Sequence, residues 1–143
     1  MGRILAIDYG DARIGLAVSD PLGMIASPLK TIPSTTYEAN AQAIGREIEE
    51  HLVERVVIGL PLAMGGNDTE QTRNVRAFLA VLKRVIWLPV EEIDERLSTV
   101  EATRALQSKG VKTGHHKGDV DKTAAAILLQ TYLEKRQYVP HNS

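Results

Sequence analysis

Two apolar segments near the start of the chain are separated by only three residues, which restricts how they can pair. Residues 3–9 (RILAIDY) and 13–19 (RIGLAVS) both have the composition of buried strands. Parallel strands need a crossover of a dozen or more residues, and the linker Gly10-Asp11-Ala12 cannot supply one. The two segments are therefore predicted to form an antiparallel hairpin.

Strand and helix patterns alternate after this hairpin. A strand from about Met24 to Thr31 is expected at a sheet edge, because Pro28 cannot donate a ladder hydrogen bond. The further predicted elements are a helix with Ala41, Ile44, Ile48 and Leu52 on its apolar face, a strand over 55–59, a helix capped near Asp68 or Thr69 that buries Val75, Phe78, Leu79 and Leu82, a strand over 85–93, a helix from a capping box at Ser98 to about Ser108, and a helix from about 120 to 135. This order predicts an α/β fold with a mixed sheet and helices on both faces.

Length and composition limit the class of protein. A chain of 143 residues without a linker or repeat is expected to form one domain over 1–143. It has no cysteine, which excludes disulfides and thiolate metal sites. No secretory signal or apolar run of membrane-spanning length is evident, so a cytoplasmic protein without membrane contact is expected.

Acidic residues follow predicted strands or open a helix at three places. Asp8 closes the first strand, Asp94 and Glu95 close a later one, and Asp121 begins the last helix. Ligands of α/β sheets gather beyond the carboxyl ends of strands, where these acids can converge. Each acid also has a purely structural explanation, such as a turn residue or a favourable helix start. Asp8 is the hardest to explain in that way, since burying its charge costs several kcal/mol unless it is compensated.

Three converging carboxylates repel one another, and Mg²⁺ or Mn²⁺ would remove that repulsion. Two such ions ~4 Å apart can activate a water and stabilise the leaving oxygen of a phosphodiester. The chain has no Cys–His pair, no Gly-x-Ser-x-Gly turn and no His-Glu-x-x-His helix, so the corresponding chemistries are not indicated. The acids therefore favour metal-dependent hydrolysis of nucleic acid.

Basic residues suggest where a polyanion would bind. Arg13 follows the hairpin turn, and Lys112 and Lys117 belong to a basic segment over 104–122. A surface arginine and a solvated helix flank explain the same residues equally well. The glycine- and lysine-rich segment 110–118 is predicted to be a mobile, substrate-gated loop, with a plain connector as the alternative.

Four ordered blocks of the sequence resemble the YqgF family, also called RuvX. They are Ile7-Asp8-Tyr9-Gly10 with Arg13 to Asp20, Val57 to Leu62, Asp94-Glu95-Arg96-Leu97-Ser98-Thr99 with Glu101-Ala102, and Lys117-Gly118 through Asp121 to Leu128. The resemblance implies a ribonuclease H-like fold and trimming of the 5′ end of precursor 16S ribosomal RNA, with Holliday-junction resolution as an older proposal. It also implies catalytic acids at Asp8, the Asp94-Glu95 pair and Asp121.

The motif does not decide between the two adjacent acids. Glu95 is preferred as the metal ligand because its side chain is longer, and Asp94 is then expected to orient Arg96 or to cap the following turn. Arg13, Arg96, Lys112 and Lys117 are the expected substrate contacts, and the chain is expected to be a monomer or weak homodimer.

Two other functions share some of these features. Sugar kinases and actin-like ATPases also begin with a strand, Asp-x-Gly and a hairpin, but they need two such domains, which 143 residues cannot supply. A non-catalytic RNA-binding assembly factor with the same fold is the other alternative. Whether the substrate is RNA or branched DNA stays open at this point.

Overall fold

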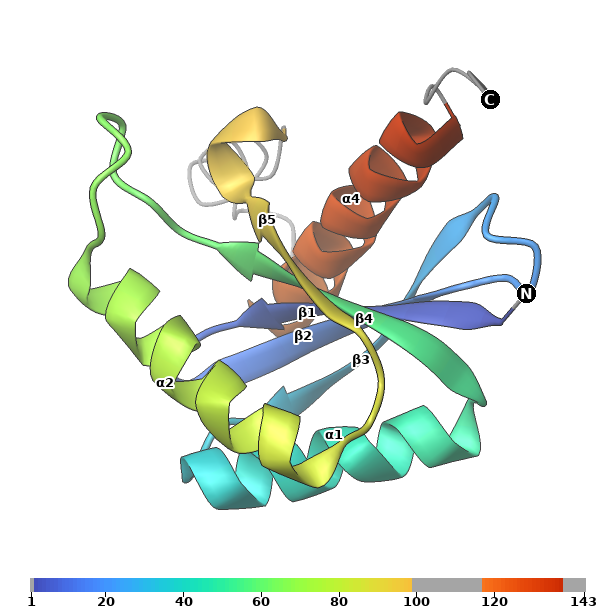
Figure 1. Cartoon of the computed structure of the whole chain (residues 1–143), viewed down its shortest axis with the longest axis horizontal. Coiled ribbons are helices and arrows are strands. Elements are labelled where there is room, and N and C mark those ends of the chain that lie inside the picture. Colours follow the sequence, from blue (N-terminus) through green and yellow to red (C-terminus); the bar gives the residue numbers. More distant parts are fainter. Residues whose placement is uncertain (1, 99–116, 138–143) are drawn as a thin grey trace.

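A mixed sheet forms the centre of the computed structural model, which describes residues 2–98 and 117–137 and, within these, the side chains of 2–98 and 122–136. In these residues the strand order is β3-β2-β1-β4-β5 (Figure 1). The strands are β1 (Arg3–Tyr9), β2 (Arg13–Ser19), β3 (Ala26–Pro33), β4 (Val53–Leu60) and β5 (Val90–Asp94). The pairs β1–β2 and β2–β3 are antiparallel, whereas β1–β4 and β4–β5 are parallel. The predicted hairpin and mixed sheet are confirmed.

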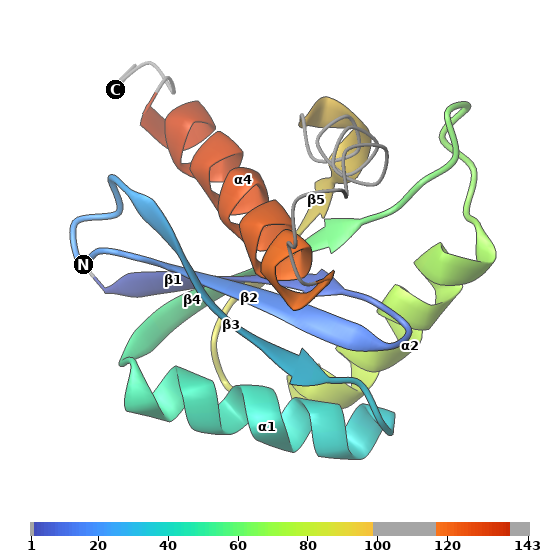
Figure 2. The ribbon, with the colours of Figure 1, turned by 180° about the vertical axis from the view of Figure 1, so that it is seen from behind.

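Helices cover both faces of the sheet, as predicted. The helices α1 (Tyr37–Glu50) and α2 (Glu70–Val85) lie on one face, and α4 (Lys117–Gln137) crosses the other (Figures 1 and 2). A single 3₁₀ turn, η1 (Glu95–Leu97), follows β5. Among the described residues, no helix is both long enough and apolar enough to span a membrane.

The central strand β1 sends alternate side chains to the two faces. Leu5, Ile7 and Tyr9 belong to the larger core under α1 and α2, where the Tyr9 ring stacks on Phe78 at 4.3 Å between centroids. Ile4 and Ala6 belong to a second core under α4. Because side chains alternate along a strand, Asp8 continues this second set and lies on the α4 face.

Small residues line the α4 side of the sheet. Ala6, Ala17 and Val57 meet Ala125 and Leu129 of α4 in this second core. Side chains of this size let the helix approach the strands closely. The last helix is therefore packed directly over the face that carries Asp8.

Three predicted boundaries are wrong, each for a local reason. Leu52 is not on the buried face of α1: the helix ends before it, and Leu52 adopts a left-handed conformation (φ 54°) with 78% of its surface exposed. The strand predicted from Val85 starts at Val90, because α2 continues through Val85. The strand predicted from Met24 starts at Ala26, because the Asp20 carboxylate accepts the Met24 and Ile25 N–H groups at 2.8 Å and holds a turn there.

Other boundaries differ by less. The strand predicted over 55–59 extends over Val53–Leu60, and the expected edge position of Pro28 is confirmed, with a register irregularity between Leu16 and Ala17 opposite it. Thr69 is the N-cap of α2, one of the two residues predicted. The helix α4 begins at Lys117, so the predicted loop over 110–118 is wrong at its last two residues. The rest of that loop, the helix predicted after Ser98 and the tail lie outside the described residues.

Candidate active site

Asp8 lies near the end of β1 with two glycines beside it. The residue is 7% exposed. On β2 its direct partner is Gly15. On β4 the parallel register pairs Ile7 with Ile58, so Gly59 is the next residue alongside Asp8. Paired residues share a face of the sheet, so neither strand neighbour places a side chain beside the Asp8 carboxylate on the α4 face.

Glu95 occupies the room that Gly59 leaves. It is the first residue of η1, immediately after β5, and is only 3% exposed. A Cβ atom added to Gly59 would lie 2.5 Å from Glu95 Oε1 and 3.0 Å from Glu95 Cγ. The Glu95 side chain therefore folds back over Gly59, next to Asp8. The structure thus brings together two of the three acids that the sequence indicated, on neighbouring positions of one buried face.

The third acid, Asp121, lies in the first turns of α4, and its side chain is outside those described. It precedes Ala125 by one helical turn, and Ala125 packs against the sheet in the core that includes Ala6. Lys117 is the first residue of α4, also without a described side chain, and Lys112 lies outside the described residues.

Asp94 has a different role from Glu95. Its Oδ1 accepts the Arg96 backbone N–H at 2.9 Å and Arg96 Nε at 3.0 Å, so it caps η1 and orients the guanidinium. These hydrogen bonds from Arg96 hold the pKa of the Asp94 carboxyl below its ordinary value. Both structural roles expected for Asp94 are confirmed.

Arg96 connects this turn to the loop between β4 and α2. Its Nη1 donates to the Met64 carbonyl at 3.0 Å. Gly66 lies beside the guanidinium and has a φ of 91°, a left-handed conformation that favours glycine. Asp94, Arg96 and the loop thus form a brace that fixes the chain on which Glu95 sits.

Arg13 lies on the same face as Asp8. Gly15 and Ala17 follow it at every second position of β2 and therefore share its face of the sheet. Ala17 is in the core under α4. Asp8 is opposite Gly15, so Arg13 is its diagonal neighbour across the hairpin, at roughly 7–8 Å between backbones. An arginine side chain can cross that distance. The predicted direction of Arg13, back toward the strand end, agrees with this position.

Gly59 is the residue whose importance the sequence analysis missed. Glycine weakens a strand unless a neighbour needs the space of its missing side chain. Its position at the end of the β-branched run Val56-Val57-Ile58 was the available signal.

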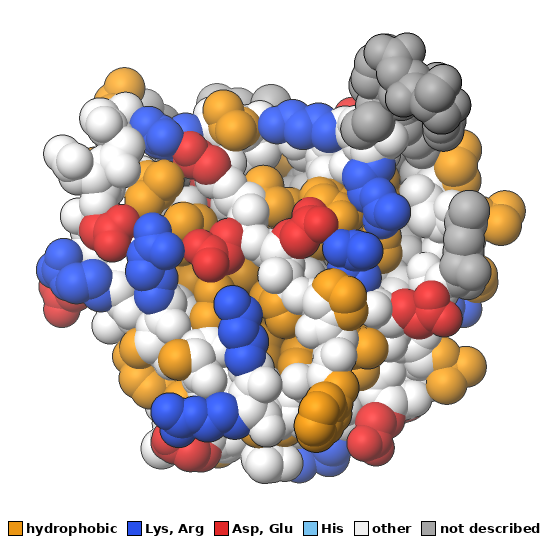
Figure 3. All heavy atoms as spheres, in the orientation of Figure 1, with side chains coloured by type: hydrophobic (Ala, Val, Ile, Leu, Met, Phe, Trp, Pro, Cys, Tyr) orange, Lys and Arg blue, Asp and Glu red, His pale blue; other side chains and the backbone are white. Residues whose placement is uncertain are grey.

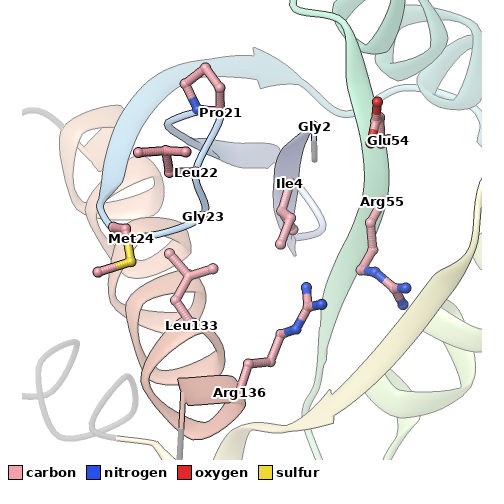
Figure 4. Close-up of a pocket in the computed structure, with 10 residues that line it drawn as sticks. All are labelled: Gly2, Ile4, Pro21, Leu22, Gly23, Met24, Glu54, Arg55, Leu133 and Arg136. Atoms are coloured by element: carbon pink, nitrogen blue, oxygen red, sulfur yellow. The ribbon is translucent and has the colours of Figure 1, made fainter.

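Two other features of the described surface lie away from these acids. Glu47, Glu50 and His51 cluster at the end of α1, where Lys30 Nζ contacts Glu47 Oε2 at 3.0 Å and supplies a positive charge. A hollow of about 330 Å³ lies at the opposite end of β1, between the Leu22–Met24 loop and α4 (Figure 4). Its wall includes Ile4, Leu133 and Arg136 and no carboxylate from the site around Asp8.

Comparison with known proteins places this arrangement in a family. Residues 2–135 match the family described as "RuvX: Holliday junction resolvase". The chain belongs to the RuvX family. A relative from Koribacter versatilis is 41% identical over 135 residues, which is 94% of this chain and 88% of that protein. One from Chloroflexus aggregans is 43% identical over 134 residues, 94% of each chain. Both relatives of this RuvX chain carry the name "Putative pre-16S rRNA nuclease".

Solved structures agree with the ribonuclease H-like, resolvase-type fold of the RuvX chain. Thermus thermophilus RuvC in complex with a Holliday junction substrate gives a TM-score of 0.56 at 15% identity, covering 96% of this chain and 97% of that one. The fowlpox virus Holliday junction resolvase gives 0.52 at 12% identity, covering 93% and 99%. At these identities the likeness concerns the fold. The family match shows a member of a nuclease family, as the sequence predicted.

The contact between Gly59 and Glu95 can be tested by stability alone. Gly59→Ala should lower the free energy of unfolding by about 1–3 kcal/mol, because the new methyl group overlaps the Glu95 side chain. In a Glu95→Ala background the same change should be neutral or slightly stabilising. Urea unfolding of the four proteins measures this cycle. Equal losses of stability in the wild-type and Glu95→Ala backgrounds would show that the new methyl group overlaps a group other than Glu95.

The Asp94–Arg96 pair predicts a pH dependence of stability. A carboxyl whose pKa is lower in the folded state stabilises fully above its unfolded pKa and loses that contribution as pH falls through the folded value. The stability difference between the wild type and Asp94→Asn should therefore be present at neutral pH and shrink below about pH 4. Denaturant unfolding at several pH values measures it. In an Arg96→Met background this pH dependence should largely disappear, and its persistence would contradict the assignment.

Proposed function

We propose that this chain is a metal-dependent nuclease acting through Asp8, Glu95 and Asp121, and that it processes the 5′ end of precursor 16S ribosomal RNA. The observation that carries the proposal is the placement of the buried Asp8 and Glu95 side chains on neighbouring positions beside Gly59. Two adjacent buried acids are costly for a fold, and a divalent cation offsets that cost. The names of the relatives support the RNA substrate.

The donor set fits Mg²⁺ or Mn²⁺. Carboxylate oxygens are the ligands that these hard ions prefer. Asp8 and Glu95 provide such oxygens, and helical periodicity puts position 121 on the face of α4 that carries Ala124, Ala125 and Leu128, which supports Asp121 as a third ligand. When bound, the ions would activate water and stabilise the leaving oxygen of the phosphodiester.

The protein residues supply positioning. Asp8 is held by the central strand, and Glu95 by its contact with Gly59 and by the Asp94–Arg96 brace. We assign the metal to Glu95 rather than Asp94, because the oxygens of Asp94 already accept hydrogen bonds from Arg96. Asp94 acts as a positioning residue.

Nucleic acid is the proposed partner, and its phosphates would meet four cations. Arg13 shares the face of Asp8, and Arg96 lies beside Glu95 with 32% of its side chain exposed. Lys112 and Lys117 precede Asp121 in the sequence and complete the proposed set. We further propose a single cytoplasmic domain over 1–143 that works as a monomer or weak homodimer.

Two alternatives define the experiment. The family description favours cleavage of a Holliday junction as the second candidate activity. A non-catalytic RNA-binding factor would bind RNA whether or not its acids were intact. Purified protein with Mg²⁺ or Mn²⁺ should be offered both a precursor 16S RNA and a four-way DNA junction, and the preferred substrate distinguishes the first two.

Substitution of the acids tests the catalytic assignment. Asp8→Asn and Glu95→Gln should each lower the cleavage rate by orders of magnitude while the proteins stay folded, since each removes one of two crowded charges. Asp94→Asn is the matched control. Its cleavage rate should fall by no more than the roughly 10- to 100-fold decrease that is typical when a group orienting a metal ligand is removed. Cleavage rates and circular dichroism measure both effects. Full activity in Asp8→Asn would refute the proposal.

A further inference from the structure

Trp87 is the only tryptophan of the chain and is 99% exposed. It lies between α2 and β5, a segment that the nuclease site around Asp8 and Glu95 does not use. Large aromatic rings are seldom left wholly in water, and exposed ones are enriched where proteins bind partners. The ring therefore needs an explanation beyond the fold.

A groove of about 730 Å³ begins at this ring. Gln42, Gly45, Arg46 and Glu49 of α1 form one wall, and the segment from Arg84 to Leu88 forms the other. A cavity of this size accommodates a small organic group such as a base with its sugar. The wall thus offers a flat aromatic surface and charged side chains to the same occupant.

Two of the three charged residues in the groove lining are basic. Arg46 and Arg84 are exposed, and within the described ranges neither has an ion-pair partner. Glu49 is the one acid in the groove wall among the described residues. Figure 3 shows lysine and arginine side chains spread over α2 on this face of the molecule. Unpaired cations beside an aromatic ring fit an anionic chain with stacking groups.

We propose that this groove binds a single-stranded segment of the RNA substrate, with a base stacked on Trp87 and phosphates held by Arg46 and Arg84. The inference rests on the proposed function, and it adds a binding site remote from the catalytic acids. A protein partner could also use an aromatic ring and arginines, but the unpaired cations favour a polyanion.

The path from the groove to the acids runs along β5 and carries no unpaired acid from that strand. Trp87 and Glu95 are eight positions apart, a span of at most about 28 Å. The exposed carboxylates of this edge are both paired: Glu91 with Arg55 at 2.9 Å and Glu92 with Arg76 at 3.3 Å. A strand of several nucleotides passing over the β5 edge can therefore reach both places.

Tryptophan fluorescence tests the proposal directly, since all of the signal comes from Trp87. The Asp8→Asn protein should be titrated with a labelled, unstructured RNA oligonucleotide while label anisotropy and tryptophan emission are recorded together. Emission should be quenched along the same curve as the anisotropy. Trp87→Ala should weaken binding by about 5- to 100-fold, and Trp87→Phe should restore most of it. Arg84→Ala and Arg46→Ala should each reduce the steepness of the salt dependence by about 0.7.

Leu22→Ala is the matched control, because Leu22 is another exposed apolar side chain and lies outside this groove. It should leave RNA binding unchanged. RNA binding without a change in Trp87 emission, or no RNA binding at all, would overturn the proposal. So would an emission change that depends on protein concentration alone, which would identify the groove as a contact with a second copy. If RNA quenches Trp87 emission but the wild-type protein cleaves no RNA, the proposed function is refuted and this binding site still stands.

Discussion

The missing side chain at Gly59 is the constraint on which the acidic site depends. Any larger residue there would occupy the volume that the Glu95 carboxyl group now fills. Without that volume Glu95 could not fold back from η1 onto the sheet beside Asp8. Glycine normally destabilises the interior of a strand, so Gly59 lowers the stability of the sheet. In return it leaves room for the charged side chain of Glu95.

The rest of the fold separates packing from chemistry by using the two faces of the sheet differently. The face under α1 and α2 carries large side chains, including Leu16 and Ile58, which form the greater part of the core together with Phe78 of α2. The face under α4 carries alanines, glycines and the acids.

Much of this arrangement follows from local sequence patterns. The hairpin, the mixed sheet and the placement of helices on both faces could be predicted, because apolar periodicity and the three-residue linker allow few alternatives. The errors occurred where a specific side chain overrode periodicity or where periodicity itself was ambiguous. Asp20 holds a turn where a strand was expected, and α2 runs through Val85, where an apolar run fits a helix or a strand equally well.

The site shows the same division. The positions of Asp8 and Glu95 at strand ends could be predicted, whereas the contact of Glu95 with Gly59 could not, since it joins residues 36 positions apart in the sequence. The brace from Arg96 to the Met64 carbonyl is of the same kind. Lys112 keeps the support of the sequence alone, and the structure adds to Asp121 only its position on α4.

The two outer strands of the sheet have a consequence for self-association. An exposed strand edge can pair with the same edge of another molecule and start aggregation. Here the outer strand β3 contains Pro28, which lacks a backbone donor, and β5 is only five residues long. Both features disfavour pairing with another chain, so contact between two copies through helices or loops is favoured over strand addition.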